Sequence, residues 1–480
     1  MRRIQVGKPV AERAVAQSAE LQARFDAVRA ENDVPQGFPP EVEAEAEQVA
    51  GSPDLPERDE TSVPFLTVDP PGSMDLDQAL HLERDGEGYR VRYAIADVPA
   101  FVRAGGAIDA ETRRRGQTIY APDRRTPLHP SVVSEGAASL LPDQVRPAYV
   151  WDMRLAADGE GTQVSLYRAL VRSTDRFDYD RVQAAVDAGG ADERLELLKE
   201  VGILRIELER RRGGASLPMP EQEVTEDEGG HYRLHFRPPL DAEDWNAQIS
   251  LMTGMAAAEL MLGAKVGILR TMPAPDESAV RQFRRASRAL GVEWREDVPY
   301  GEFLRTLDRT DPKHLALIHE ATALFRGAGY TPFDGSAPQD SQHAAVAAAY
   351  AHVTAPLRRL VDRFGLAICA AISAGTEPPG WAREALPSLP AVMASSGMVA
   401  RAVERGCADA VEAAAVEDRV GEVFDAVVVD QRAEGRAVVQ VEEPAVLANA
   451  TGDHDLGTRV KVRLVEASIS TSTVRFEIVP

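Results

Sequence analysis

The stretch TVDPPGSMDLDQAL, residues 67–80, places three aspartates, Asp69, Asp75 and Asp77, directly after a short apolar run. That run, FLTV, has the composition of a β-strand, so the aspartates are predicted to lie where a strand passes into a loop. Carboxylates this close together repel one another unless a cation joins them. Hard oxygen ligands suit Mg²⁺ or Mn²⁺, and two such ions could activate a water and stabilise the leaving oxygen of an in-line displacement.

Taken alone, the acidic stretch is equally typical of a solvated turn. A calcium loop fits it less well, because DLDQA lacks the glycine and the closing glutamate of such a loop. The chain contains no GxxxxGK[ST] phosphate loop and no HExxH, GxSxG or CxxC motif. Any chemistry must therefore come from the aspartates and from residues that the fold brings to them.

The chain has 480 residues, of which 44% are hydrophobic, so two or three domains are expected. Its formal net charge of −22 argues against a protein that coats nucleic acid non-specifically, but not against one that confines its basic groups to a channel. No apolar stretch approaches the ~20 residues of a membrane span, and no apolar segment follows the first arginines as in a signal peptide. We expect a cytoplasmic protein without membrane association.

The order of patterns along the chain indicates an α+β fold. Residues 1–60 read as a short helical segment, with a helix-turn-helix unit as one option. Alternating, β-prone runs such as YRVRYAIADV follow, and from about residue 178 the pattern is helical, including a helix from about Ser388 to Glu417. Residues 419–480 return to short alternating strands and match the size of a five-stranded OB barrel.

Three further motifs accompany the acidic stretch in a fixed order. They are YAIADVPAFV at 93–102, GQTIYAPD at 116–123 and YAHVTAPLRRLVDRF at 350–364. Together they resemble the catalytic domain of the ribonuclease II and ribonuclease R family, over residues Phe65 to Ala415. The resemblance implies a mixed α/β RNB-type catalytic domain, here residues 61–418, with a deep channel in which single-stranded RNA reaches two metal ions 3′ end first. It also implies that residues 419–480 form an RNA-binding OB fold.

The resemblance also carries a set of metal ligands and catalytic residues. Asp69, Asp75 and Asp77 match the first three aspartates of the family's acidic motif, and Gln78 stands where the family has a fourth. The implied catalytic residues are Asp75, Asp77 and Arg358, with Asp77 indispensable and Mg²⁺ or Mn²⁺ as cofactor. A guanidinium group can bind phosphate through two hydrogen bonds and steady charge in the transition state, which suits Arg358 to this role.

Four residues are implied to contact RNA. Tyr120 matches the aromatic residue that stacks on a base near the 3′ end, although a half-buried core tyrosine would look the same in the sequence. Arg358 matches the arginine at the scissile part of the backbone, and its neighbour Arg359 is either a second RNA contact or structural. Glu404, in ARAVERG, lies where the family has a glutamate facing the last nucleotides, although a solvated helix glutamate is the plainer interpretation.

The chain departs from the family pattern in several places. A glutamine at position 78 offers no charge, which puts a second metal ion in doubt. The family's usual histidine before IADV is Ala94, its usual glutamate and asparagine on one helix are Gln248 and Gly254, and Leu360 follows PLRR. Only about 60 residues precede the acidic stretch, so we expect the cold-shock OB folds common in the family to be replaced by the helical segment.

The function that these observations favour is a monomeric, magnesium-dependent exoribonuclease. It would shorten single-stranded RNA, and RNA with duplex regions, from the 3′ end to nucleoside 5′-monophosphates. A catalytically inactive RNA-binding homologue is the alternative, because Gln78 weakens the metal site. A metal-dependent phosphatase for small substrates would suit the paired aspartates but not an arginine-rich chain of this length.

Overall fold

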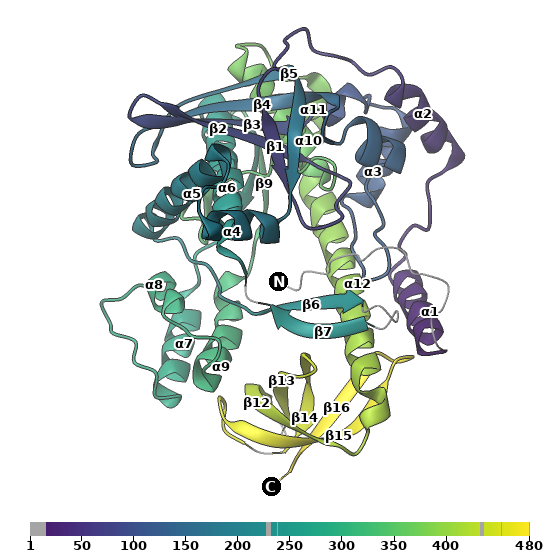
Figure 1. Ribbon diagram of the computed structural model, residues 1–480, viewed down its shortest axis with the longest axis vertical. Coiled ribbons are helices and arrows are strands. Elements are labelled where there is room, and N and C mark those ends of the chain that lie inside the picture. Colours follow the sequence, from purple (N-terminus) through teal and green to yellow (C-terminus); the bar gives the residue numbers. More distant parts are fainter. Residues whose placement is uncertain (1–15, 227–231, 238, 433–435, 453, 480) are drawn as a thin grey trace.

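The acidic stretch begins at the end of the first strand of a closed barrel. The computed structural model describes residues 16–226, 232–237, 239–432, 436–452 and 454–479 (Figure 1). In the barrel the first strand pairs antiparallel with the second and parallel with the fifth, which closes the sheet. The barrel strands are β1 (Phe65–Val68), β2 (Gln78–Asp85), β3 (Gly88–Ala96), β4 (Val145–Leu155) and β5 (Gly161–Phe177).

Alternation along β3 and β4 explains why these segments form a barrel with a packed interior. Tyr93 lies opposite Trp151 in the register, and both side chains are buried. Outward positions are polar, as in the ion pair of 2.7 Å between Arg90 and Asp152. Because side chains alternate between the two faces of a strand, this pattern fixes which face of each strand is buried.

Three helices cover the barrel and share its hydrophobic core. Trp245, Ile249 and Phe364 are among the buried residues that join them to the strands. A Cβ atom placed on Gly202 would lie 2.7 Å from the Cα atom of Trp245, so two of the helices touch backbone to backbone there. These helices are α5 (Glu193–Arg212), α6 (Asp241–Ala264) and α10 (Leu360–Ser373).

Gly254 lets the segment that precedes the PLRR motif lie directly on α6. The N–H of Ala351 donates to the carbonyl oxygen of Gly254 at 3.0 Å. A Cβ atom at position 254 would lie 2.6 Å from the carbonyl oxygen of Ala351 and still closer to the ring of Tyr350. A glycine at this point of α6 therefore fixes the approach of residues 350–359 to the barrel.

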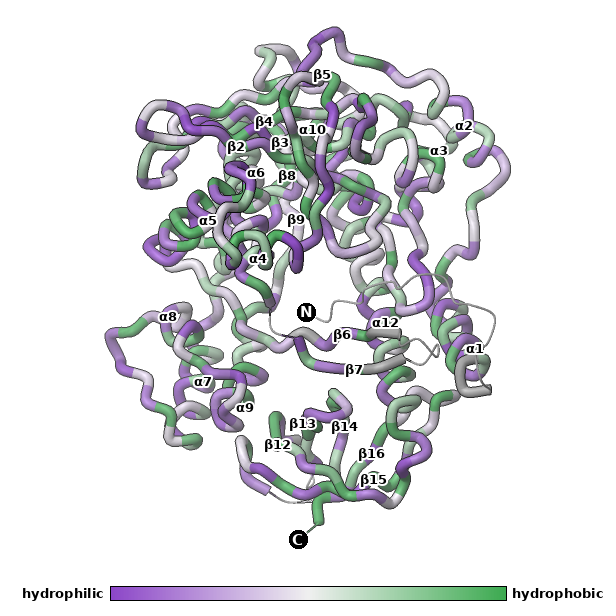
Figure 2. Tube along the Cα trace, in the orientation of Figure 1, coloured by the Kyte–Doolittle hydropathy of each residue, from purple (hydrophilic) through white to green (hydrophobic). Residues whose placement is uncertain are grey.

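The C-terminal part of the chain forms the second closed barrel, and the five-stranded barrel expected from the sequence is confirmed. In Figure 2 hydrophobic and hydrophilic stretches alternate along its strands, in keeping with the alternating burial of β15. Leu315 of a neighbouring helix packs on the outside of this barrel against Val427 and Val429. The barrel strands are β12 (Val423–Arg432), β13 (Arg436–Val441), β14 (Val446–Thr451), β15 (Arg459–Ser468) and β16 (Thr473–Val479).

A long helix, α12 (Leu389–Val416), joins the two barrels and is close to the predicted limits of 388 and 417 (Figure 1). The hairpin of β6 (Glu221–Glu226) and β7 (Tyr232–Arg237) packs against it through Val224 and Leu234. The mixed architecture of helices and two barrels confirms the expected fold class.

The N-terminal helices belong to two different hydrophobic clusters. Helix α1 (Ala16–Glu31) packs on α12, whereas α2 (Pro40–Ala50) packs beside α3 (Ala107–Arg115). Each of the two helices is therefore buried in a different part of the structure, and the helix-turn-helix unit that was one option for residues 1–60 stays a prediction. Residues 1–15 lie outside the described residues.

The remaining elements complete the domain around the first barrel and between the two barrels. They are α4 (Tyr179–Ala188), α7 (Glu277–Ala289), α8 (Tyr300–Arg305), α9 (Pro312–Glu320), α11 (Gly380–Ala385), β8 (Val266–Thr271), β9 (Gly329–Asp334), β10 (Gln342–His343) and β11 (Ala348–Ala349), with short 3₁₀ or π turns at 98–100, 132–137, 321–325 and 417–419.

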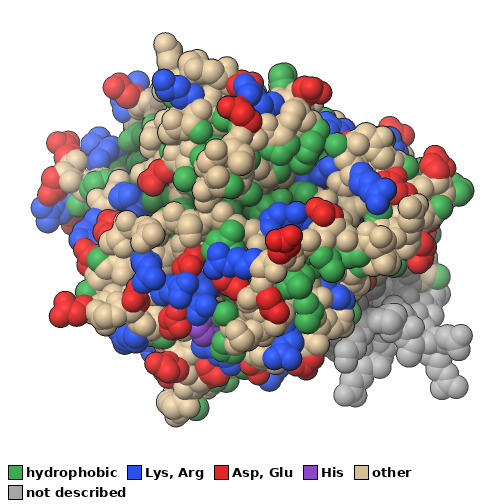
Figure 3. Space-filling view, turned by 90° about the horizontal axis from the view of Figure 1, so that it is seen from above, with side chains coloured by type: hydrophobic (Ala, Val, Ile, Leu, Met, Phe, Trp, Pro, Cys, Tyr) green, Lys and Arg blue, Asp and Glu red, His purple; other side chains and the backbone are tan. Residues whose placement is uncertain are grey.

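The surface carries charges of both signs close together. Seen from above, Lys and Arg side chains are interspersed with Asp and Glu side chains (Figure 3). Within the described residues, no helix is long and apolar enough to cross a membrane.

We expect Gly254→Ala to destabilise the chain by about 1–3 kcal/mol, because the added methyl group overpacks a contact with backbone. The matched control is Gly263→Ala on the same helix, where a Cβ atom meets nothing within 4 Å and should leave stability equal or slightly higher. Urea unfolding of both variants measures the difference. Equal stability of the two variants would show that residues 350–351 do not press on α6.

Candidate active site

Asp77 is the residue that joins the acidic stretch to the PLRR motif. Its side chain is buried, and its Oδ1 atom accepts a hydrogen bond of 2.7 Å from the N–H of Leu357. Its Oδ2 atom lies 3.2 Å from Nε of Arg358. Burial raises the pKa of Asp77 well above its ordinary value, and the positive charge of Arg358 opposes this shift only in part.

Asp69 lies at the end of β1 with an unsatisfied carboxylate oxygen. Its Oδ2 atom is buried without a hydrogen-bond partner. Burial raises the pKa of Asp69 to about 7, with Arg358 opposing the shift and Asp75 adding to it. A buried carboxylate with a free oxygen is costly unless a positive charge compensates it.

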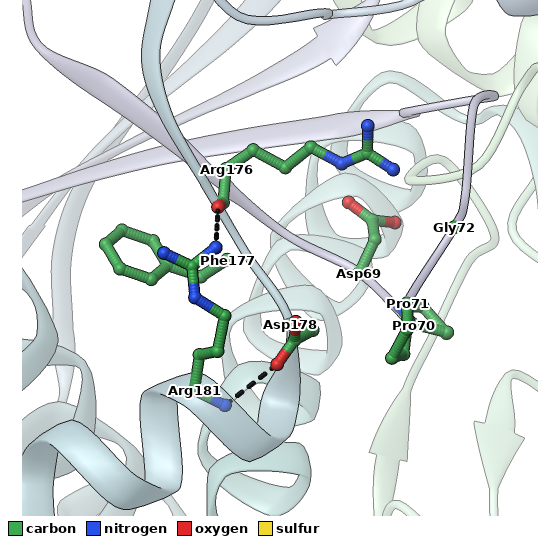
Figure 4. A pocket seen from close by; sticks show the side chains of 8 residues that line it. All are labelled: Asp69, Pro70, Pro71, Gly72, Arg176, Phe177, Asp178 and Arg181. Atoms are coloured by element: carbon green, nitrogen blue, oxygen red, sulfur yellow. Dashed lines mark hydrogen bonds between the residues drawn. The ribbon is translucent and has the colours of Figure 1, made fainter.

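A cavity of about 220 Å³ opens beside Asp69. In Figure 4 the carboxylate of Asp69 points toward the guanidinium group of Arg176, and Pro70, Pro71 and Gly72 form the opposite wall. Arg176 also donates to the carbonyl oxygen of Ser73, and this hydrogen bond stabilises the loop that carries the aspartates. The cavity therefore gives solvent a path to Asp69.

Asp75 is held by an arginine that the sequence did not single out for this site. Its Oδ1 atom accepts from Nη1 of Arg125 at 2.6 Å, and Nη2 of Arg125 lies 2.7 Å from Glu135. Arg125 is five residues beyond Tyr120 in the same loop. The place of Arg125 in the loop of Tyr120 is the only sequence feature that points to this contact. An arginine in a loop is otherwise expected to be solvated.

Gln78 has both ends of its amide group engaged within the protein. Its Nε2 atom donates to the carbonyl oxygen of Thr354 at 2.6 Å, and its Oε1 atom accepts from the hydroxyl group of Tyr93. An aspartate could not donate to Thr354, so the glutamine forms a second bridge between the acidic loop and residues 354–358. Its predicted role as a metal ligand stays a prediction.

The donor set of the acidic loop suits a divalent cation. No cluster of three or more His, Cys, Asp or Glu side chains is preassembled around a metal position among the described residues. Nevertheless Asp69 has a free buried oxygen, and the pKa values of both Asp69 and Asp77 are raised by burial. Carboxylate oxygens that lack a compensating charge are the ligands that Mg²⁺ and Mn²⁺ prefer.

The two arginines of PLRR have different environments. The Arg358 side chain is 46% exposed, so its guanidinium group can reach a ligand while it faces Asp77. Arg359 makes two hydrogen bonds, of 2.9 and 2.8 Å, to the carboxylate of Asp362 at the start of α10. The guanidinium group of Arg358 is thus open to a ligand, whereas Arg359 holds the motif on its helix.

Tyr120 is half-buried and lies among the charged groups of the site. Burial and the negative charge of Asp75 raise the pKa of its hydroxyl group. Glu404, in contrast, lies on α12 at intermediate exposure, and the hydrogen bonds and ion pairs of the described residues do not connect it with the acidic loop. Burial raises the pKa of Glu404. The charge of Asp75 thus acts on Tyr120, whereas the contact of Glu404 with the last nucleotides stays a prediction.

Comparison with known proteins identifies the family. The RNB domain matches residues 57–367, and the RNase II-type exonuclease C-terminal S1 domain matches residues 422–479. The chain belongs to the RNB family. This finding confirms the resemblance that the motifs indicated.

Two curated relatives share 29% identity with this RNB chain. Ribonuclease R of Escherichia coli (strain K12) aligns over 357 residues, which is 69% of this chain and 42% of that protein. The probable exosome complex exonuclease RRP44 of Caenorhabditis elegans aligns over 328 residues, which is 64% of this chain and 34% of that protein. The chain therefore covers less than half of the length of these two relatives.

The RNB fold is also that of a solved structure. The apo form of Mycoplasma genitalium RNase R matches with a TM-score of 0.85 and 18% identity, over 96% of this chain and 78% of that one. The same protein has been solved in complex with ribose methylated single-stranded RNA and with double-stranded RNA.

The pKa of Asp69 predicts how the stability of the metal-free RNB chain depends on pH. Folding raises this pKa from 3.8 to about 7, so between these values the folded state holds a proton that the unfolded state has lost. The Asp69 contribution to stability therefore falls as pH rises through this window, by at most about 4 kcal/mol.

Asp69→Asn removes this titration. In EDTA, the free energy of unfolding of the variant minus that of the wild type should therefore grow between pH 4.5 and pH 7.5. Urea unfolding at several pH values measures it. A difference that does not vary with pH would mean that folding does not raise the pKa of Asp69.

Proposed function

We propose that this chain is a metal-dependent 3′→5′ exoribonuclease that hydrolyses single-stranded RNA to nucleoside 5′-monophosphates, with Mg²⁺ as the resident ion. The observation that supports this most strongly is the contact of Asp77 with both Leu357 and Arg358. It joins a carboxylate cluster, suited to cations, with an exposed guanidinium group, suited to phosphate. The names of the relatives and the fold agree with this proposal.

Asp69, Asp75 and Asp77 would hold the metal ions. When bound, the metal supplies an activated water and neutralises charge on the leaving oxygen. The chain's own contribution is to keep these carboxylates in place before the ion arrives, through Leu357 for Asp77 and Arg125 for Asp75. The Oδ1 atom of Asp75 is engaged by Arg125, whereas the Oδ2 atom of Asp69 has no hydrogen-bond partner and could bind an ion directly.

Arg358 would bind the scissile phosphate group. Its planar guanidinium group can donate to two phosphate oxygens at once and stabilise the charge that grows there in the transition state. Asp77 orients this group by facing its Nε atom. The side of the guanidinium that points away from Asp77 is then left for substrate.

Tyr120 would stack on a base near the 3′ end. It comes from the loop that also carries Arg125, so base stacking and metal ligation depend on one segment. A base stacked on an aromatic ring is worth about 1–3 kcal/mol, enough to retain short fragments. Arg359 and Glu404 remain proposed RNA contacts of lesser weight, since Arg359 is engaged with Asp362.

An inactive RNA-binding homologue is the second candidate. It rests on Gln78, whose amide group is fully engaged inside the protein. Three aspartates and Arg358 are nevertheless present in the sequence, which favours the enzyme. A monomeric state, a cytoplasmic location and digestion of RNA with duplex regions also stay proposals.

A labelled RNA separates these candidates. A 5′-labelled single-stranded RNA is incubated with the chain in Mg²⁺ and in EDTA, beside a duplex with a 3′ tail. Stepwise shortening that needs the metal supports the exonuclease, and stable binding without shortening supports the inactive homologue. Release of an internal fragment in one cut would contradict a 3′→5′ mechanism.

Asp77→Asn should abolish turnover and leave affinity for RNA nearly unchanged. The amide oxygen can still accept from Leu357, so the fold is kept, while the charge needed by the metal is lost. Single-turnover rates and RNA binding in EDTA measure the two effects. Activity within about tenfold of wild type would exclude Asp77 from catalysis.

Arg358→Lys should slow hydrolysis by ~100-fold or more, about 2.7 kcal/mol, because lysine keeps the charge but loses the planar donor group. Affinity for long RNA should change much less, since many other contacts hold the strand. The matched control is Arg359→Lys, which loses the two hydrogen bonds to Asp362. This variant should lower the melting temperature and slow hydrolysis much less. If binding and rate fell together in Arg358→Lys, Arg358 would be a general contact with the strand.

A further inference from the structure

The loop of residues 119–126 lies between the acidic cluster and the N-terminal helix α1. Its ends are closed by two hydrogen bonds between Ile119 and Thr126, of 2.9 and 2.7 Å. One side of this loop contacts the site, because Arg125 binds Asp75 and the charge of Asp75 acts on Tyr120. The other side contacts α1.

The contact with α1 is a buried ion pair. Asp123 accepts from the guanidinium group of Arg29, and its second oxygen accepts from Nε2 of Gln22 at 2.8 Å. The side chains of Arg29 and Asp123 are only 2% and 7% exposed. Asp26 binds the same guanidinium group at 3.0 Å, so Arg29 is held on both sides. A pair buried in this way is little screened by solvent and holds its partners in one geometry.

Helix α1 is itself fixed by close packing on α12. Leu21, Phe25 and Val28 are buried in one cluster with Val403 and Cys407. A Cβ atom on Gly406 would lie 2.9 Å from the Cγ1 atom of Val28, so the two helices meet without room to slide. A loop that binds α1 is therefore anchored, through this packing, to α12.

The chain that follows α1 holds the same loop at its far end. Arg124 binds Asp26 at 2.8 Å and Gln36 at 3.3 Å. Arg115 donates to the carbonyl oxygen of Gly37 and, at 3.1 Å, to that of Pro127, directly after the loop. Residues 22–37 therefore contact the loop region at several points, most of them through charged groups.

We propose that α1 positions the active-site loop 119–126 through the buried pair of Arg29 and Asp123. Helix α1 then fixes the position of Tyr120, which stacks on the RNA, and of Arg125, which binds Asp75. This inference rests on the proposed exoribonuclease function. Arg29, Gln22 and Asp123 are positioning residues that act through Tyr120 and Arg125 and do not touch substrate themselves.

The test compares two arginines on the same helix. Arg29→Met removes the ion pair but keeps a buried stem of similar length. The control, Arg24→Met, changes an arginine of α1 whose bonds go to Ser472 and Glu31 and not to the loop. Two properties are measured for each: the length of the limit product from 5′-labelled RNA, and amide hydrogen exchange of a peptide that covers residues 116–126.

Arg29→Met should lengthen the limit product by several nucleotides, because stacking on Tyr120 retains the short fragments, and amide exchange in the loop should rise by about tenfold or more. Turnover of long RNA should fall much less than in Asp77→Asn, because Asp77 and Arg358 keep their contacts and only the support of Asp75 through Arg125 is loosened. Arg24→Met should leave both properties at the wild-type value. Adding Asp123→Asn to Arg29→Met should change both properties by less than Asp123→Asn does in the wild type, since the contact of Asp123 with Arg29 is already lost.

If Arg29→Met does not fold, Gln22→Met serves as the second variant. It removes an uncharged hydrogen-bond donor of Asp123 and leaves the ion pair with Arg29 intact. It should lengthen the limit product and raise amide exchange of the loop by less than Arg29→Met does. A wild-type ladder and wild-type exchange in Arg29→Met or Gln22→Met, or an equal effect of Arg24→Met, would overturn the inference. A wild-type chain that fails to shorten RNA would instead count against the proposed function, while the exchange data still test the contact of α1 with the loop.

Discussion

The carboxylate of Asp77 is the constraint on which the rest of the site depends. It is buried, it accepts from Leu357, which is 280 residues away in the sequence, and it faces Arg358. An ionised carboxylate in such a place is costly unless hydrogen bonds and positive charge surround it. Hydrogen bonds from the surrounding residues accordingly fix the position of residues 354–359. Gln78 binds Thr354, the ring of His129 donates to Leu357, and Asp362 binds both Ala355 and Arg359.

The neutral state of His129 is part of the same arrangement. Burial lowers the pKa of this histidine to about 4, so near neutral pH it supports Leu357 without adding a positive charge. The cationic groups that act on the aspartates are then Arg358, Arg125 and Arg176. All three are arginines, which keep their charge at any physiological pH. Near neutral pH the described part of this site therefore titrates through its carboxylates.

Much of the fold and part of the site could be predicted from the sequence. The order of strands and helices, the C-terminal barrel and the limits of α12 follow from periodicity, and Asp69, Asp77 and Arg358 follow from motifs. Arg125 and Arg29 could not be found in this way, since their roles depend on which distant carboxylate the fold places beside them. Gln78 illustrates the same limit: the sequence showed a missing charge, whereas the structure shows a bridge to Thr354 that an aspartate could not make.

The most direct test of this account is a calorimetric titration of the folded chain with Mg²⁺ in the absence of RNA, for the wild type and for Asp77→Asn. The wild type should bind the ion with release of protons, because Asp69 and Asp77 have raised pKa values. Asp77→Asn, folded to the same extent, should bind the ion much more weakly. Equal binding by both proteins, or binding without proton release, would contradict the claim that these buried carboxylates form the metal site.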